Sequence, residues 1–144
     1  MQALATPAIA ALGVFIGLQQ AHVSKGNLKE RLFDRRLRVF EDIQRFLSCI
    51  LEKARLDYSD LAPFNNARQK ARFLFGKEIS LYLDVIFDRS MKMNMMQIKI
   101  KSLQMGPERS KLVEEEAAHL EWLTEQLPIL FSRFEPTIGF QNYR

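Results

Sequence analysis

The distribution of charge along the chain constrains its organisation more than any motif does. No charged side chain occurs among residues 1–24, whereas the next fourteen residues carry six basic side chains against two acidic ones. The basic residues are Lys25, Lys29, Arg31, Arg35, Arg36 and Arg38. Lysine and arginine beside a membrane span favour its cytoplasmic side. We therefore predict a single transmembrane helix over 1–24, with the N-terminus outside and the C-terminus in the cytoplasm. The six basic residues are predicted to contact anionic head groups or a partner.

The length of the uncharged segment is close to the minimum for a span. Residues 3–18 correspond to about 24 Å of helix, and extension to residue 23 gives about 31 Å, against a hydrocarbon core of roughly 30 Å. Two alternatives compete with a span. A secretory signal peptide would begin with a positive region and end in small residues, and the sequence shows neither. A buried helix in a soluble bundle stays open as the rival interpretation.

Small residues recur along one face of the predicted span. The sequence 13–17 is a GxxxG motif, and the same face continues in both directions at spacings of three and four. Lipid gives apolar helices no hydrophobic reason to associate, so close backbone approach over small residues is what holds them together. We therefore predict a homo-oligomer with an interface in the span. The predicted interface residues are Thr6, Ala10, Gly13, Gly17 and Gln20.

The remainder of the chain has the composition and periodicity of a small helical domain. Hydrophobic residues make up 47% of the 144 residues, and glycine and proline are scarce. Apolar residues recur every three or four positions, which predicts an all-α fold in which the span continues into a long amphipathic helix. Gly26 is a predicted hinge or kink. The helical stretches are expected at 27–56, 65–75 and 77–103 and from Pro107 onward, with a loop at 57–63 and a kink or end at Pro128. The predicted domains are a transmembrane helix at 1–24, a cytosolic bundle at 25–136 and an extended tail at 137–144.

No residue pattern reaches the specificity of a catalytic motif. Glu116 and His119 form one Glu-x-x-His, which is half of a di-iron carboxylate site, but no second copy exists in the chain. Cys49 is the only cysteine, which rules out a multi-cysteine metal site. The methionines at 91–96 and 105 are typical of adaptable packing surfaces. We predict a non-enzymatic protein with no catalytic residue, no cofactor, no metal and no small-molecule substrate.

Two blocks of sequence carry a resemblance to a known group. The segment 32–41, LFDRRLRVFE, follows the uncharged segment, and Phe73-Leu74-Phe75-Gly76 precedes a segment with Ile79, Tyr82 and Leu83. This arrangement resembles small uncharacterised bacterial membrane proteins with one span and a cytosolic helical domain. The general layout is similar to the membrane accessory proteins of RNA-targeting (type VI-B) CRISPR systems, which combine a span with a degenerate HEPN-like bundle and assemble as rings. The resemblance implies the bacterial inner membrane and a role in antiviral defence. The Arg–His motif of HEPN ribonucleases is missing before His119.

Three hypotheses about function follow. The first is a homo-oligomeric inner-membrane protein that acts as a pore-like effector or a scaffold in phage defence. The second is a membrane-tethered interaction module that recruits a soluble protein or an RNA–protein complex. The third is a degenerate HEPN-type protein that binds RNA. The mass of the protein in detergent separates the first from the second, and an assay with single-stranded RNA tests the third.

Overall fold

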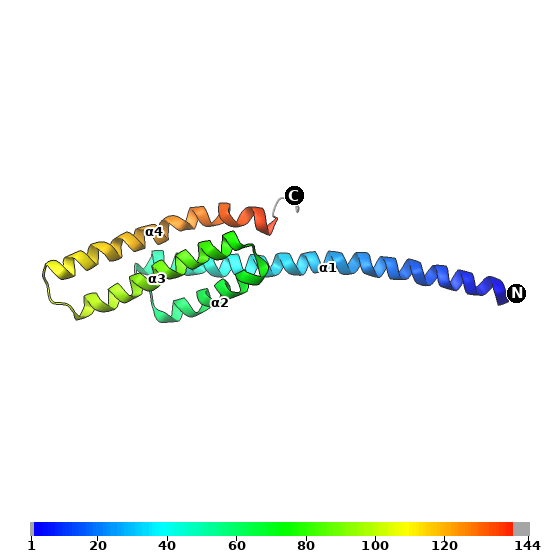
Figure 1. The fold of residues 1–144 in the computed structure, drawn as a ribbon, viewed down its shortest axis with the longest axis horizontal. Helices are drawn as coiled ribbons and strands as arrows, with labels where there is room; N and C mark the ends of the chain where they lie inside the picture. Colours follow the sequence, from blue (N-terminus) through cyan, green and yellow to red (C-terminus); the bar gives the residue numbers. More distant parts are fainter. Residues whose placement is uncertain (1, 140–144) are drawn as a thin grey trace. The chain divides into compact units, whose positions relative to one another are not determined.

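Four α-helices make up the fold of residues 2–139. A computed structural model of the chain describes residues 2–139, and it describes their side chains except at 2–13, 15 and 21–24. The helices are α1 (Gln2–Lys53), α2 (Tyr58–Leu74), α3 (Lys77–Ser102) and α4 (Pro107–Ile138), as Figure 1 shows. No strand occurs between residues 2 and 139. The prediction of an all-α fold with a long first helix is confirmed.

The chain divides into two compact units at Asp34 and Arg35. In the first unit, the described residues are the N-terminal part of α1 alone, and the second unit holds the remainder of α1 with α2, α3 and α4. In the described part of the chain, no helix combines the length and the apolarity that crossing a bilayer requires. The transmembrane helix predicted over 1–24 is therefore not supported by the structure. Most of that segment, at 2–13, 15 and 21–24, lies outside the residues whose side chains are described.

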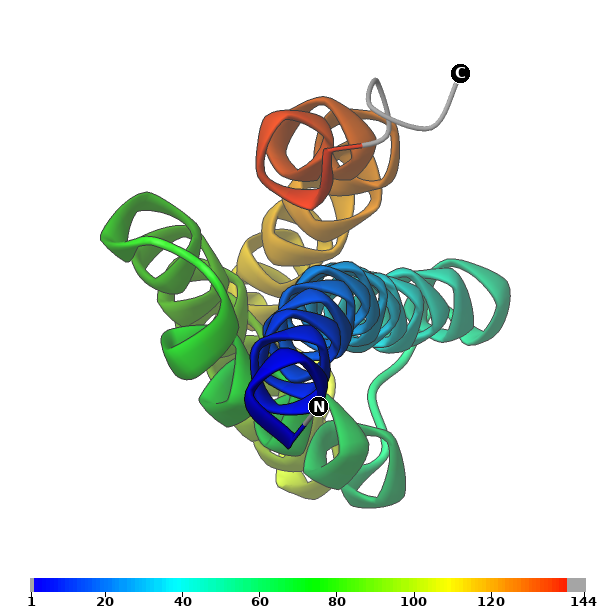
Figure 2. The ribbon, with the colours of Figure 1, turned by 90° about the vertical axis from the view of Figure 1, so that its right-hand side faces the viewer.

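The second unit is built around a core to which all four helices contribute. The helices α3 and α4 lie side by side, and α2 packs against α3, as the two views show (Figures 1 and 2). Phe64 of α2 is fully buried, and its ring stacks on Phe46 of α1 at 4.3 Å between centroids. Phe134 of α4 is also fully buried and contacts Phe40 at 5.6 Å and Phe75 at 5.0 Å. Large aromatic side chains bury the most area per residue, so these contacts dominate the packing of the unit.

The second helix begins earlier than its sequence indicates. The loop predicted at 57–63 is wrong for most of its length, because α2 starts at Tyr58. Pro63 lies inside the helix, where it lacks the N–H that would bond the carbonyl of Ser59. The loss is offset by burial, since Leu61 and Phe64 share one face of the first turns and are 5% and 0% exposed.

The C-terminal end of α4 also differs from the expected boundary. The helix α4 continues through Pro128 and Pro136 to Ile138, two residues into the segment expected to be an extended tail. Ile138 is buried, and Gly139 ends the helix with φ at 78°, in the left-handed region that favours glycine. The remainder of the expected tail, 140–144, lies outside the described residues. Helix α1 runs through Gly26 from the uncharged segment into the bundle, as one long helix, which the sequence indicates.

Candidate functional site

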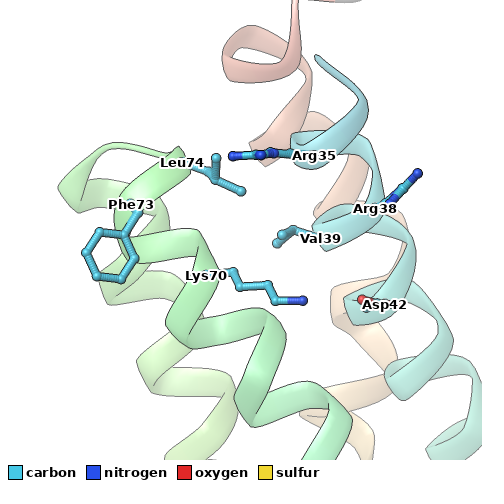
Figure 3. A pocket seen from close by; sticks show the side chains of 7 residues that line it. All are labelled: Arg35, Arg38, Val39, Asp42, Lys70, Phe73 and Leu74. Atoms are coloured by element: carbon cyan, nitrogen blue, oxygen red, sulfur yellow. The ribbon is translucent and has the colours of Figure 1, made fainter. Parts of the chain in front are cut away.

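A basic groove lies between α1 and α2 in the second unit. On α1, Arg35, Arg38 and Asp42 recur at spacings of three and four, and they therefore lie along one face of the helix. On α2, Phe73 and Leu74 follow Lys70 by three and four positions. These residues and Val39 line a groove of about 380 Å³. Figure 3 shows Arg35 and Lys70 extending into the groove from opposite walls, with Val39 and Leu74 between the helices, whereas Arg38 and the ring of Phe73 point away from it.

The groove carries an excess of positive charge. Among the residues that the structure describes, Arg35, Arg38 and Lys70 make no hydrogen bond and no ion pair. The one acidic group of the lining, Asp42, lies 3.5 Å from the guanidinium of Arg45. The ring of Phe73 is 91% exposed and points away from the groove. The groove therefore presents unneutralised cations next to the apolar side chains of Val39 and Leu74, a combination that can bind an anion with an apolar part.

Arg36, next to Arg35, has a different environment. Its Nε donates to the carbonyl oxygen of Leu74 at 2.8 Å, and its Nη1 donates to that of Thr137 at 2.9 Å. These carbonyls belong to the last turns of α2 and α4, where helix carbonyls lack partners and the helix dipole favours a cation. The guanidinium also lies 5.8 Å from the centre of the Phe75 ring. Arg36 therefore joins three helices of the bundle, whereas Lys25, Lys29, Arg31, Arg35 and Arg38 are exposed.

The predicted interface residues of the N-terminal segment are only partly described. Thr6, Ala10 and Gly13 lie outside the residues whose side chains the structure describes. Gly17 and Gln20 are exposed, and a Cβ added at Gly17 would meet no atom within 4 Å. The described apolar residues of the same stretch are exposed as well, with Val14 at 64%, Ile16 at 45% and Leu18 at 68%. The space that close helix packing would need is therefore open at Gly17.

Glu116 and His119, the Glu-x-x-His pair, both interact with residues of α3. Glu116 accepts a hydrogen bond from Nε2 of Gln97 at 2.8 Å, and Oε1 of Gln97 accepts one from the backbone N–H of Leu56 at 3.1 Å. Glu116 thereby links α4 through α3 to the connection between α1 and α2. Burial, followed by the charges of Arg89 and Lys92, lowers the pKa of His119, so its imidazole is neutral near pH 7. The described residues include no cluster of three groups able to hold a metal ion.

Sequence reasoning missed two residues of α2 that line the groove, Lys70 and Phe73. A signal for Phe73 was present in the Phe73-Leu74-Phe75-Gly76 block. Phe75 is 8% exposed and packs on Phe134, whereas Phe73 is 91% exposed at the end of the same helix. A large aromatic ring so exposed beside a buried one is the unusual feature of the block.

Comparisons with protein-family models, with curated protein sequences and with solved structures found nothing that matches this chain.

Proposed function

We propose that the chain is a non-enzymatic, self-associating protein of the bacterial inner membrane, anchored by its uncharged N-terminal segment. In this proposal residues 1–24 enter the bilayer, the basic residues from Lys25 onward lie at the cytoplasmic surface, and the helical bundle is cytosolic. The proposal rests on one observation above the others, the contrast in charge within the single helix α1. Its uncharged stretch precedes six basic side chains in the next fourteen residues.

The exposure of apolar side chains in the first unit supports an environment other than water. Val14 and Leu18 share one face of the helix and Ile16 lies on the opposite face, because each residue turns the helix by about 100°, and all three are exposed. A helix that presents large apolar side chains on several faces needs lipid or another protein to cover them. Lipid covers every face at once, and a second helix covers only one.

Self-association follows from the composition of the same segment. In lipid, helices associate where small residues allow their backbones to approach, and Gly13 and Gly17 form such a pair at spacing four. The open space at Gly17 supports this part of the proposal, because no side chain of the chain itself fills it. The small residues Thr6 and Ala10 continue the same face towards the N-terminus, at spacings of four and three residues.

Fractionation and a topology reporter test the anchor. Full-length protein expressed in bacteria is expected to stay in the membrane pellet after carbonate extraction. A fluorescent reporter fused after Arg144 is expected to be active in the cytoplasm, and alkaline phosphatase at the same position is expected to be inactive. Complete extraction by carbonate would contradict the anchor, and an active phosphatase fusion would contradict the orientation.

Light scattering of the detergent-solubilised protein tests self-association. The expected result is a protein mass that is a whole multiple, above one, of the 16.8 kDa chain. A monomer at concentrations well above those in cells would contradict the oligomeric part of the proposal and leave the anchor standing.

A second candidate function is recruitment of a soluble partner. It is favoured by exposed apolar side chains near the connection between α3 and α4. Met95 and Ile98 of α3 are 54% and 62% exposed, and Met105 in the α3–α4 connection is 86% exposed. Flexible methionine side chains adapt to varied apolar partners. Replacing Met105 and Ile98 by Gln would abolish such recruitment without changing membrane extraction, which separates this function from anchoring.

A further inference from the structure

We propose that the groove between α1 and α2 binds the phosphate head group of an anionic phospholipid. The inference rests on the proposed membrane anchor and adds to it a defined lipid site with residues from α2. Arg35 and Lys70 extend into the groove from opposite walls, so an anion between them meets a cation on each side (Figure 3). Arg38 adds a third positive charge at the edge.

The size and the lining of the groove favour a head group over a larger ligand. A volume of about 380 Å³ is at the lower end of the range for small-molecule sites and cannot hold a helix from another protein. The lining combines three cations with Val39, Phe73 and Leu74. A phospholipid offers both kinds of partner, because its phosphate is anionic and its glycerol and acyl region is apolar. Free phosphate would leave the apolar side chains of Val39 and Leu74 without a partner.

The acidic residue of the lining sets a requirement on the ligand. The Asp42 carboxylate repels an anion, but Arg45 at 3.5 Å offsets its charge. With Asp42 counted in full, the three cations leave the groove with two net positive charges, which exceeds the single charge of a phosphodiester. The exposed ring of Phe73 suits the interfacial zone of a bilayer, where aromatic side chains concentrate.

The groove begins a short distance along the chain from the uncharged segment. Arg35 follows Ser24, the last residue of the uncharged segment, by eleven residues (35 − 24). Lysine and arginine side chains close to an anionic membrane surface are attracted to it. A groove held at that surface meets anionic lipid at a high local concentration.

Native mass spectrometry of the full-length protein in detergent tests the site. The protein is titrated with phosphatidylglycerol or phosphatidylcholine of the same acyl chains, and retained lipids are counted per protein. Wild type is expected to retain phosphatidylglycerol in preference to phosphatidylcholine. In Arg35→Gln/Lys70→Gln, the affinity for phosphatidylglycerol is expected to fall by roughly thirtyfold, from the general scale for two cations near anionic head groups.

Two matched variants control for charge alone. Lys99→Gln/Lys101→Gln removes two exposed cations from the end of α3 and is expected to leave lipid retention unchanged. Lys25→Gln/Lys29→Gln removes the same charge from the basic flank and is expected to affect retention less than the groove variant does. Phe73→Ala is expected to weaken the binding of phosphatidylglycerol. It should leave the melting temperature of the protein unchanged, because the Phe73 ring contacts little of the rest of the protein.

The outcomes separate the lipid site from its alternatives. Equal retention of the two lipids, or equal losses in the groove and control variants, would overturn the proposal. Displacement of phosphatidylglycerol from wild type by millimolar inorganic phosphate would also overturn it, because the site would then belong to the free ion. Carbonate extraction is measured on the same variants. Extraction of the wild-type protein by carbonate would contradict the anchor. A loss of phosphatidylglycerol retention that is confined to the groove variant would concern the groove alone.

Discussion

The two units of the chain use the same kind of residue in opposite ways. In the second unit, the apolar side chains of α1 face the other helices, with Ile43 and Leu47 both 0% exposed. In the first unit, Val14 and Leu18 on the same helix are more than 60% exposed. Helical periodicity alone does not separate the two. The difference lies in whether the chain itself provides a surface to cover the apolar face, and only the second unit does so among the described residues.

This comparison implies two separate sources of stability. The bundle is held by its own packing and should respond to changes in its core. The N-terminal helix depends on something outside the chain, and changes there should alter membrane residence or assembly while the bundle stays folded.

The largest expected effect is in the aromatic core. Phe64→Ala removes a fully buried ring that stacks between Phe46 and Phe87, and it should lower the free energy of unfolding by about 3–5 kcal/mol. Chemical denaturation followed by circular dichroism measures the loss. The matched control is Phe73→Ala, which removes the same ring from a 91% exposed position and should change stability by less than about 0.5 kcal/mol. Similar losses in the two variants would contradict the assignment of the core.

The next effect distinguishes two neighbouring arginines. Arg36→Met removes both hydrogen bonds to the helix carbonyls and should destabilise the bundle by about 2–3 kcal/mol, since bonds from charged donors are the stronger kind. Arg36→Lys should recover only part of this, because an ammonium group cannot reproduce the fork of a guanidinium. Arg35→Met should leave unfolding unchanged and reduce retention of anionic lipid. The reverse pattern in the two arginines would show that the bundle and the groove are misassigned.

A third effect is confined to the first unit. Gly13→Leu with Gly17→Leu should weaken self-association by about 1–3 kcal/mol per interface, because large side chains hold the backbones apart. Light scattering in detergent measures the mass, and carbonate extraction should stay as in wild type. Val14→Leu and Ile16→Leu place the same side chain on other faces and should do much less. An unchanged mass in the double glycine variant would mean that the bundle alone drives assembly.

The smallest effect is a dependence on alkaline pH within the bundle. The Tyr82 hydroxyl donates to Oε1 of buried Gln126 at 2.8 Å, and burial raises the pKa of Tyr82 to about 12. The unfolded chain ionises near pH 10, so the stabilisation is complete below pH 10 and is lost as pH rises towards 12. Tyr82→Phe should cost about 1 kcal/mol at pH 7. The difference in unfolding free energy between wild type and Tyr82→Phe should decrease as pH rises from 10 to 12, by no more than about 1.4 kcal/mol per pH unit. A constant gap over that interval would contradict the raised pKa.

Much of the helical layout follows from the sequence by itself. The apolar period of three to four residues predicts α3 and the start of α4, and Gly106-Pro107 marks the beginning of α4 as proline at a first helical position should. The charge step between Ser24 and Lys25 also needs no structure to be seen. These features are local, and each is determined by a few neighbouring residues.

Tertiary structure decided which side chains share a surface. Arg35 and Arg36 are adjacent and chemically identical, yet one lines an open groove and the other bonds the ends of α2 and α4. A turn of about 100° per residue puts neighbours on different faces, but the sequence does not show which face another helix will cover. The start of α2 at Tyr58 has the same cause, because burial of Leu61 and Phe64 by other helices outweighs the unfavourable Pro63. Lys70 lines the same groove as Arg35 only because α2 folds back along α1, although the two residues are thirty-five positions apart in the sequence.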